Sequence, residues 1–166
     1  MLVRTGIGQA VFRFLPLDSA KPLVIGGIIF EDIPGFQSNS DGDVVFHAIC
    51  NAISSLTGVP ILEGIVDDLC RKDGITDSEV YLKEALKTLG TQQIYHVAIT
   101  LEAKKPRFGP DIQKMRENIS RIMHIEMSQV GITSTSGEGL SDVACGEGVR
   151  CLVIVTTFEE RMKAKG

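Results

Sequence analysis

The feature that most constrains the fold is the alternation of strand-length apolar runs with segments whose apolar residues recur at helical spacing. The expected strands are residues 3–15, 22–31, 94–103, 130–135 and 149–160. The expected helices run from about Asp41 to Thr57, over 76–90 and over 111–124, and residues 58–76 are expected to form a loop with a short helix around Ile65–Cys70. A series of this kind buries its apolar faces by layering a sheet against helices. We therefore expect an α+β fold, a two-layer sandwich with the sheet on one side and helices on the other.

Size and charge narrow the class of protein. The 166 residues, of which 43% are apolar, suit a single domain over 1–166. The net charge of -4 argues against nucleic acid as a partner, because phosphate binding needs a basic face. Apolar runs are too short to span a membrane, and the first residues carry no signal-peptide pattern. We expect a soluble cytoplasmic protein, or a plastid-type one if a transit peptide has been removed, with no membrane partner.

Cysteine and histidine are the usual ligands of transition metals, so the spacing of these residues indicates whether the chain can hold such a metal. The four cysteines form no CxxC pair, and we expect reduced core residues at Cys50, Cys70, Cys145 and Cys151. His96 lies inside an apolar strand run, and His124 lies near the end of an expected helix. Of the three histidines, His47 alone has acidic and polar neighbours, so it is the candidate for chemistry.

The stretch NSDGDVVFH leads from a loop into a helix. Ser40 or Asp41 can cap this helix, and Asp43 falls in its first turn. Unpaired N–H groups and the helix dipole suit an anion there, with Asn39 and Ser40 as added donors. Asp43 and His47 are four residues apart, so they share a helix face and can pair. The alternative is that the first residues only cap the helix and His47 only packs.

Two further segments point to phosphate. Residues 133–148 are rich in glycine and hydroxyl groups, so backbone N–H groups can approach a phosphate, and Glu138 can hold a divalent cation against it. Residues 102–110 carry three positive charges within four positions. The alternatives are an ordinary flexible connection and a solvated basic turn. Together the three segments indicate a phosphorylated small molecule, with a divalent metal as a candidate cofactor.

In order along essentially the whole chain, these motifs resemble the 2-C-methyl-D-erythritol 2,4-cyclodiphosphate synthase family of the non-mevalonate isoprenoid pathway. SDGDVVFHA is the most specific match, and the supporting matches are RTGIGQ…RFLP, IGGIIFE, ITDSEVYLKEA, EAKKPRFGP and TSTSGEGL…GEG. The resemblance implies a homotrimer around a hydrophobic cavity, with sites between adjacent subunits. It also implies a CDP-linked methylerythritol 2-phosphate, whose 2-phosphate attacks the β-phosphorus, releases CMP and closes a cyclic diphosphate. Zinc and a second divalent ion would support this step.

The resemblance assigns roles to single residues. His47 falls on a zinc ligand, and Glu138 would hold the second metal. Asn39 falls on a position that is usually histidine and keeps a donor for phosphate. Ser136 keeps a hydroxyl that would steady the transition state. The implied substrate-binding residues are Ser40, Lys104, Lys105, Pro106, Arg107, Phe108, Gly109, Pro110, Thr135, Ser136, Gly137 and Glu138.

The chain also departs from the family's pattern. An Asp-x-His pair that supplies two zinc ligands falls on Ala10 and Phe12, whose side chains coordinate nothing. Catalytic zinc needs about three protein ligands, so zinc is not expected here, and magnesium or manganese at Glu138 is the candidate metal. Cys145 stands where the family has arginine, and its sugar-binding segment is not recognisable in residues 58–70.

Two functions are therefore open from the sequence. The first is a synthase that still turns over, as the intact SDGDVVFHA motif and the hydroxyls of residues 135 and 136 favour. The second is a catalytically impaired homologue that serves as a trimeric nucleotide-binding or isoprenoid-diphosphate-binding protein. The paired change at Ala10 and Phe12 favours the second, because both positions belong to one coordination sphere.

Overall fold

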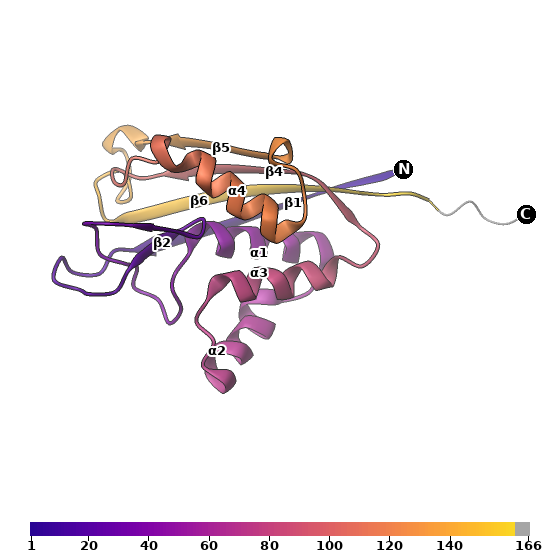
Figure 1. Cartoon of the computed structure of the whole chain (residues 1–166), viewed down its shortest axis with the longest axis horizontal. Coiled ribbons are helices and arrows are strands. Elements are labelled where there is room, and N and C mark those ends of the chain that lie inside the picture. The colour runs from indigo at the N-terminus through magenta and orange to yellow at the C-terminus, as the bar shows by residue number, and fades with distance from the viewer. Residues whose placement is uncertain (162–166) are drawn as a thin grey trace, which may run out of the picture.

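The computed structural model describes residues 1–161, which contain a four-stranded sheet in the order β1-β6-β4-β5 (Figure 1). Its strands are β1 (Leu2–Arg13), β6 (Gly148–Glu159), β4 (Gln93–Glu102) and β5 (Val130–Thr135). The strand β6 is antiparallel to both of its neighbours, whereas β4 and β5 are parallel. The parallel pair is joined through a crossover that contains a helix, as parallel strands require. The helices are α1 (Val44–Thr57), α2 (Asp67–Asp73), α3 (Ser78–Leu86) and α4 (Ile112–Met123).

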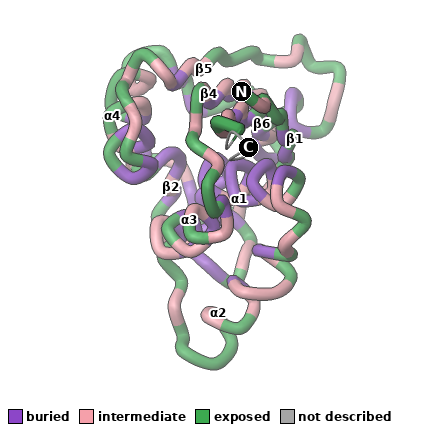
Figure 2. Tube along the Cα trace, turned by 90° about the vertical axis from the view of Figure 1, so that its right-hand side faces the viewer, coloured by how far each residue is buried: buried purple, intermediate pink, exposed green. Residues whose placement is uncertain are grey.

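One face of the sheet is covered by helices and carries the core. Side chains of β4 and β6 alternate, so that Val97, Val153 and Val155 are buried while Ile154 is exposed. The buried stripe meets the apolar faces of α1, α3 and α4 in one cluster. Figure 2 shows the buried residues gathered between the sheet strands and α1 and α3. The expected α+β arrangement of a sheet and helices is confirmed. The last five residues of the predicted 1–166 domain lie outside the described part of the chain.

The helix α1 lies unusually close to β1, which positions the residues of the candidate site. A Cβ atom at Gly8 would stand 2.1 Å from the carbonyl oxygen of Ala48, and one at Gly6 would stand 2.2 Å from that of Ala52. Two glycines on one face of the strand therefore let the helix backbone rest directly on the sheet. Positions 10 and 12 continue the same face toward the start of α1.

Three expected boundaries are corrected. Residues 22–31 form a hairpin of β2 (Leu23–Ile25) and β3 (Ile28–Phe30), because Gly26 and Gly27 both take positive φ and reverse the chain. The helix expected from Asp41 begins at Val44, because the carboxylate of Asp43 caps it. Residues 58–76, expected as a loop with a short helix, contain a π-helical turn (Ile61–Val66) followed by α2.

The opposite face of the sheet is apolar and is not covered by any helix of residues 1–161. Its exposed side chains come from β1 and β6 and include Val3, Ile7, Val11, Leu152 and Ile154. Of these, Ile7, Leu152 and Ile154 line a hollow of about 500 Å³ together with residues of β4 and β5. Among residues 1–161 no single helix is long and apolar enough to cross a membrane. The helix α1 and the segment Ile61–Asp73 meet that length and composition only together, and the chain bends sharply between them.

Candidate active site

His47 lies in the first turn of α1 and is surrounded by rings and hydroxyl groups. Its imidazole stands edge-on to Phe12 of β1, with ring centroids 5.1 Å apart, and 5.9 Å from the ring of Tyr81 of α3. The Nε2 atom lies 3.2 Å from the Oγ atom of Ser40 and 3.1 Å from that of Ser78. Among residues 1–161, the hydrogen-bond partners of the His47 imidazole are therefore two serines.

Asp43 does not pair with His47 through its carboxylate, which corrects the prediction from their spacing. Its buried carboxylate accepts hydrogen bonds from the N–H groups of Val45 and Phe46, as a helix cap does. It also accepts from Gly26 at 2.9 Å and Gly27 at 2.7 Å, in the β2–β3 turn. Burial raises the pKa of Asp43 to about 7, while the backbone N–H groups oppose that rise. Asp43 thus joins the hairpin to α1.

Asp41 joins the loop before α1 to the start of α3. Its Oδ2 atom accepts the N–H of Ser78 at 3.0 Å, and its Oδ1 atom accepts the N–H of Asp43 at 3.1 Å. The hydroxyl of Ser78 also donates to Oδ1 of Asp41. Sequence reasoning missed Ser78 and Tyr81, because these two neighbours of His47 are more than 30 residues away from it along the chain. Their segment, TDSEVYL, predicts a helix start and supports the family resemblance, but it assigns no role to either residue.

A chamber of about 330 Å³ opens beside His47. We define it by its lining residues Phe12, Ser38, Asn39, Ser40, His47, Leu62, Val66, Asp67, Cys70, Arg71 and Tyr81. Burial lowers the pKa of His47 to about 4, although the nearby Asp41 raises it. The imidazole is therefore neutral at pH 7, and the chamber offers an uncharged ring, a serine hydroxyl, an exposed amide, and the guanidinium of Arg71, which is paired with the carboxylate of Asp67 at 2.9 Å. The predicted residues Asn39, Ser40 and His47 come together here.

The residues around His47 do not fit a zinc ion. Phe12 takes one of the two expected ligand positions, and its ring packs on both His47 and Phe36, with centroids 5.1 and 5.7 Å away. The other position, Ala10, carries only a methyl group. Within residues 1–161 no three His, Cys, Asp or Glu side chains lie close enough together to hold a metal. A single imidazole does not supply the three ligands of a catalytic zinc site.

The predicted phosphate loop follows β5 and is exposed. The Ser136 hydroxyl accepts the N–H of Glu138 at 3.2 Å and lies 3.3 Å from its Oε1 atom. The Thr135 hydroxyl accepts the N–H of Gly137 at 3.2 Å. Magnesium is commonly held by one or two carboxylates together with substrate phosphates, so exposed Glu138 fits a divalent ion of that kind.

The basic loop after β4 divides into exposed and buried residues. Lys104, Lys105 and Arg107 are exposed, and the two lysines line a pocket of about 490 Å³ that also includes Cys145. Phe108 is buried against Phe30, with ring centroids 5.9 Å apart. Pro106 is likewise buried, whereas Gly109 and Pro110 are exposed. Any base recognition by this loop therefore falls to backbone groups and exposed side chains.

The cysteines are all free, as expected, but they are not all core residues. Cys50 and Cys151 are buried, Cys70 is partly buried beside the chamber, and Cys145 is exposed. Burial raises the pKa of the Cys50 thiol to about 12 and that of Cys151 further still, so both stay protonated. The prediction of a core position is wrong for Cys145, which ends a turn of the glycine-rich loop.

One chain does not bring the predicted site residues together. The chamber adjoins β1, and Glu138 follows β5, which are the two edge strands of the sheet. Three inter-strand steps separate these edges, roughly 14 Å at the usual strand spacing. Both groups lie at the same end of the sheet, because Phe12 pairs with Val149 and Glu102 pairs with both Arg150 and Thr135.

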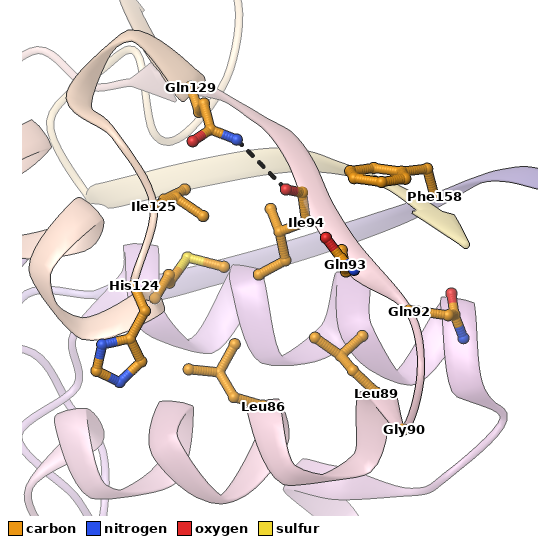
Figure 3. A pocket seen from close by; sticks show the side chains of 11 residues that line it. Leu86, Leu89, Gly90, Gln92, Gln93, Ile94, His124, Ile125, Gln129 and Phe158 are labelled. Atoms are coloured by element: carbon orange, nitrogen blue, oxygen red, sulfur yellow. Dashed lines mark hydrogen bonds between the residues drawn. The ribbon is translucent and has the colours of Figure 1, made fainter. Parts of the chain in front are cut away.

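A separate pocket of about 460 Å³ lies at the other end of the sheet (Figure 3). It is bounded by Leu86 at the end of α3 and Leu89 just after it, by His124 after α4, and by Phe158 of β6. The side chain of Gln129 crosses its rim and donates to the carbonyl of Ile94 at 3.3 Å. This pocket contains none of the predicted site residues, so the chamber and the two loops remain the candidate active site.

Comparisons with known proteins identify the relatives of this chain. The sequence pattern of the YgbB family matches residues 3–158. The chain is 55% identical over 159 residues to the 2-C-methyl-D-erythritol 2,4-cyclodiphosphate synthase of Chlamydia caviae, covering 95% of this chain and 90% of the relative. It is 54% identical over 159 residues to the synthase of Chlamydia abortus, with 95% and 90% covered.

Solved structures show the same fold. The 2C-methyl-D-erythritol 2,4-cyclodiphosphate synthase of Plasmodium vivax matches with a TM-score of 0.80 at 26% identity, over 96% of this chain and 100% of that one. The CDP complex of IspF from Plasmodium falciparum matches with a TM-score of 0.82 at 22% identity, over 96% and 97%. The predicted resemblance is thus confirmed, and the chain belongs to the YgbB family, whose curated relatives are named 2-C-methyl-D-erythritol 2,4-cyclodiphosphate synthases.

Proposed function

We propose that this chain is an active synthase that converts CDP-linked methylerythritol 2-phosphate to the 2,4-cyclodiphosphate and CMP. The observation that carries the proposal is 55% identity to a named synthase over 95% of the chain. The reaction is an intramolecular phosphoryl transfer, for which positioning and charge stabilisation suffice without a protein nucleophile. The comparisons favour this function over an impaired binding protein, because the matched relatives carry the name of the synthase.

The exposed loops supply groups of the right chemistry for a diphosphate. Hydroxyls of Thr135 and Ser136 stand at the end of β5, beside Gly137 and Glu138. Lys104 and Lys105 add positive charge at the same end of the sheet. A magnesium or manganese ion held by Glu138 and substrate phosphates would spread negative charge over the leaving group. The substrate's 2-phosphate would be received by donors of the chamber, among them Asn39, Ser40 and Arg71.

A homotrimer would bring the two groups together. The chamber lies on the β1 edge of the sheet and the phosphate loop on the β5 edge, so a complete site needs the opposite edge of a neighbouring subunit. The bare apolar face of the sheet supports association, because contiguous apolar patches commonly mark interfaces between chains. In this assembly the loop of residues 104–110 and the chamber would bind one CDP-linked substrate from two sides.

The test is release of CMP from the CDP-linked substrate, with magnesium or manganese present. Unmodified protein should release CMP, and Ser136→Ala and Glu138→Gln should each slow the reaction by about 10²-fold, the scale of losing one charge-stabilising group. Lys87→Gln is the control and should leave the rate unchanged, because Lys87 is exposed just after α3 and lines neither the chamber nor the pocket beside the basic loop. Release no faster than in a protein-free sample would overturn the proposed activity.

A further inference from the structure

A chain of hydrogen bonds runs from Asp41 through Ser78 to His47. The hydroxyl of Ser78 donates to Oδ1 of Asp41, and its oxygen lies 3.1 Å from Nε2 of His47. Ser78 is fully buried at the start of α3, so water does not compete for these bonds. The arrangement resembles the way a carboxylate fixes a ring nitrogen elsewhere in proteins, with a serine placed between the two.

The direction of each bond follows from counting protons. Both oxygens of Asp41 already accept backbone N–H groups, Oδ2 from Ser78 and Oδ1 from Asp43. The carboxylate is therefore the acceptor and Ser78 the hydroxyl donor. A serine hydroxyl has only one proton, so Ser78 has none left for His47. Its oxygen must accept from the ring, which places the proton of the neutral imidazole on Nε2.

Ser40 does not decide the position of that proton. Its hydroxyl oxygen accepts the N–H of Gly42 at 3.1 Å and lies 3.2 Å from Nε2 of His47. Because its own proton is not committed to another group of residues 1–161, Ser40 can either donate to Nε2 or accept from it. Of the two serines, Ser78 alone is restricted to accepting from the ring.

The other ring nitrogen then carries the lone pair. Among residues 1–161, Nδ1 of His47 has no hydrogen-bond partner, yet it is not among the fully buried unpaired polar atoms. The ring lines the chamber, so Nδ1 is open to it. With Ala10 and Phe12 alongside, residues 1–161 place no group of three His, Cys, Asp or Glu side chains around this nitrogen that could hold a metal ion.

We propose that Asp41 and Ser78 are positioning residues that hold neutral His47 as its Nε2–H tautomer, so that Nδ1 accepts a hydrogen bond from a ligand instead of binding a metal. The ligand group must be a donor, either a hydroxyl or a protonated phosphate oxygen. A fully ionised phosphate has only acceptors and would be repelled by the lone pair. The identity of the ligand rests on the proposed function, whereas the tautomer does not.

The tautomer is measured by a two-bond ¹H–¹⁵N correlation spectrum of the unmodified protein at pH 7.5. His47→Gln identifies the signals of His47 among the three histidines. The ring proton Hδ2 correlates most strongly with Nε2, which tells the two nitrogens apart. We expect Nε2 of His47 at the shift of a protonated nitrogen and Nδ1 at that of an unprotonated one. The reverse assignment would overturn the proposal without any variant being needed.

Matched variants test the relay. Ser78→Ala removes the oxygen that can only accept and leaves Ser40 free to donate, so the signals should move toward the Nδ1–H tautomer. Ser40→Ala should keep the Nε2–H tautomer, and Ser78→Thr, which retains the hydroxyl, should restore it. An unchanged tautomer in Ser78→Ala, or a switch in Ser40→Ala alone, would show that Ser78 does not fix the ring. Unmodified protein that shows the Nε2–H tautomer but releases no CMP would count against the proposed activity only.

Discussion

The ring of Phe12 stands almost perpendicular to the imidazole of His47, at 85° with centroids 5.1 Å apart. An edge-to-face pair of this kind is a favourable aromatic contact. It occupies the flank of His47 where the family resemblance implied a second metal ligand. Phe12 therefore does more than fail to coordinate, because its ring also fills space beside the imidazole and packs on Phe36.

The first prediction concerns metal content. Purified protein should contain no stoichiometric zinc, whereas Ala10→Asp with Phe12→His should bind about one zinc per chain, since an Asp-x-His pair on one strand face plus His47 gives about three ligands. Inductively coupled plasma mass spectrometry after dialysis measures the content. The single change Ala10→Asp is the control, because it leaves only two ligands at best. One zinc per unmodified chain, removed by His47→Ala, would contradict the prediction.

The layered fold and the site's first element could be predicted from sequence for identifiable reasons. The strand β1 was expected at residues 3–15 and observed at Leu2–Arg13, because its sequence alternates between the two sheet faces. The helix ending at Thr57 was expected from its apolar period, and in the structure it ends at Gly58, which takes the left-handed conformation. In both cases, the signal is local and does not depend on tertiary partners.

What could not be predicted depends on contacts between distant segments. Three polar residues, Ser40, Asp41 and Asp43, precede the helix, and each could cap it. Asp43 is the cap because the N–H groups of the β2–β3 turn hold its carboxylate in place. The partner Ser78 of His47 comes from another helix. The spacing of Ser78 and His47 along the sequence does not indicate this contact. Spacing along one helix had instead suggested Asp43, whose carboxylate is engaged elsewhere.

The second prediction tests the close contact of β1 and α1. Gly8→Ala should lower the free energy of unfolding by roughly 3 kcal/mol, because the new Cβ would meet backbone atoms that cannot move aside. Those atoms are the carbonyl oxygen of Ala48 at 2.1 Å and the nitrogen of Ala52 at 2.3 Å. Gly109→Ala is the control, since nothing lies within 4 Å of its Cβ. Guanidinium unfolding measures the free energy of unfolding of both variants. Equal decreases in Gly8→Ala and Gly109→Ala would argue against close packing as the cause.

The third prediction is a pH dependence of stability that arises from His47. Burial lowers its pKa from 6.5 to about 4 in the folded chain. The stability that it contributes is complete above pH 6.5 and is lost as the pH falls toward 4, because the unfolded chain binds the proton first. The loss should reach about 2 kcal/mol at pH 5.

The measurement is the difference between unmodified protein and His47→Gln in guanidinium unfolding at pH 7.5 and pH 5. A difference is needed because Asp43, whose pKa is raised to about 7, acts in the opposite direction over this range. Folded Asp43 keeps its proton to higher pH, so its contribution to stability falls as the pH rises. Asp43 is present in both proteins, and its effect cancels. A difference that does not change with pH would show that His47 is not held neutral by burial.

The last prediction separates two capping aspartates. Asp43→Asn should lower the free energy of unfolding by about 2 kcal/mol. The carboxylate accepts four N–H groups through two oxygens, whereas asparagine offers one oxygen and points the NH2 group of its amide at N–H donors. The hydrogen bonds that are weakened join Asp43 to Gly26 and Gly27 of the hairpin as well as to the first turn of α1. Asp77→Asn is the matched control at the start of α3, where the side chain accepts only from Glu79. Asparagine caps helices as well as aspartate does, so this change should cost less than about 0.5 kcal/mol. Equal thermal shifts in the two variants would mean that the hairpin bonds of Asp43 contribute nothing beyond an ordinary cap.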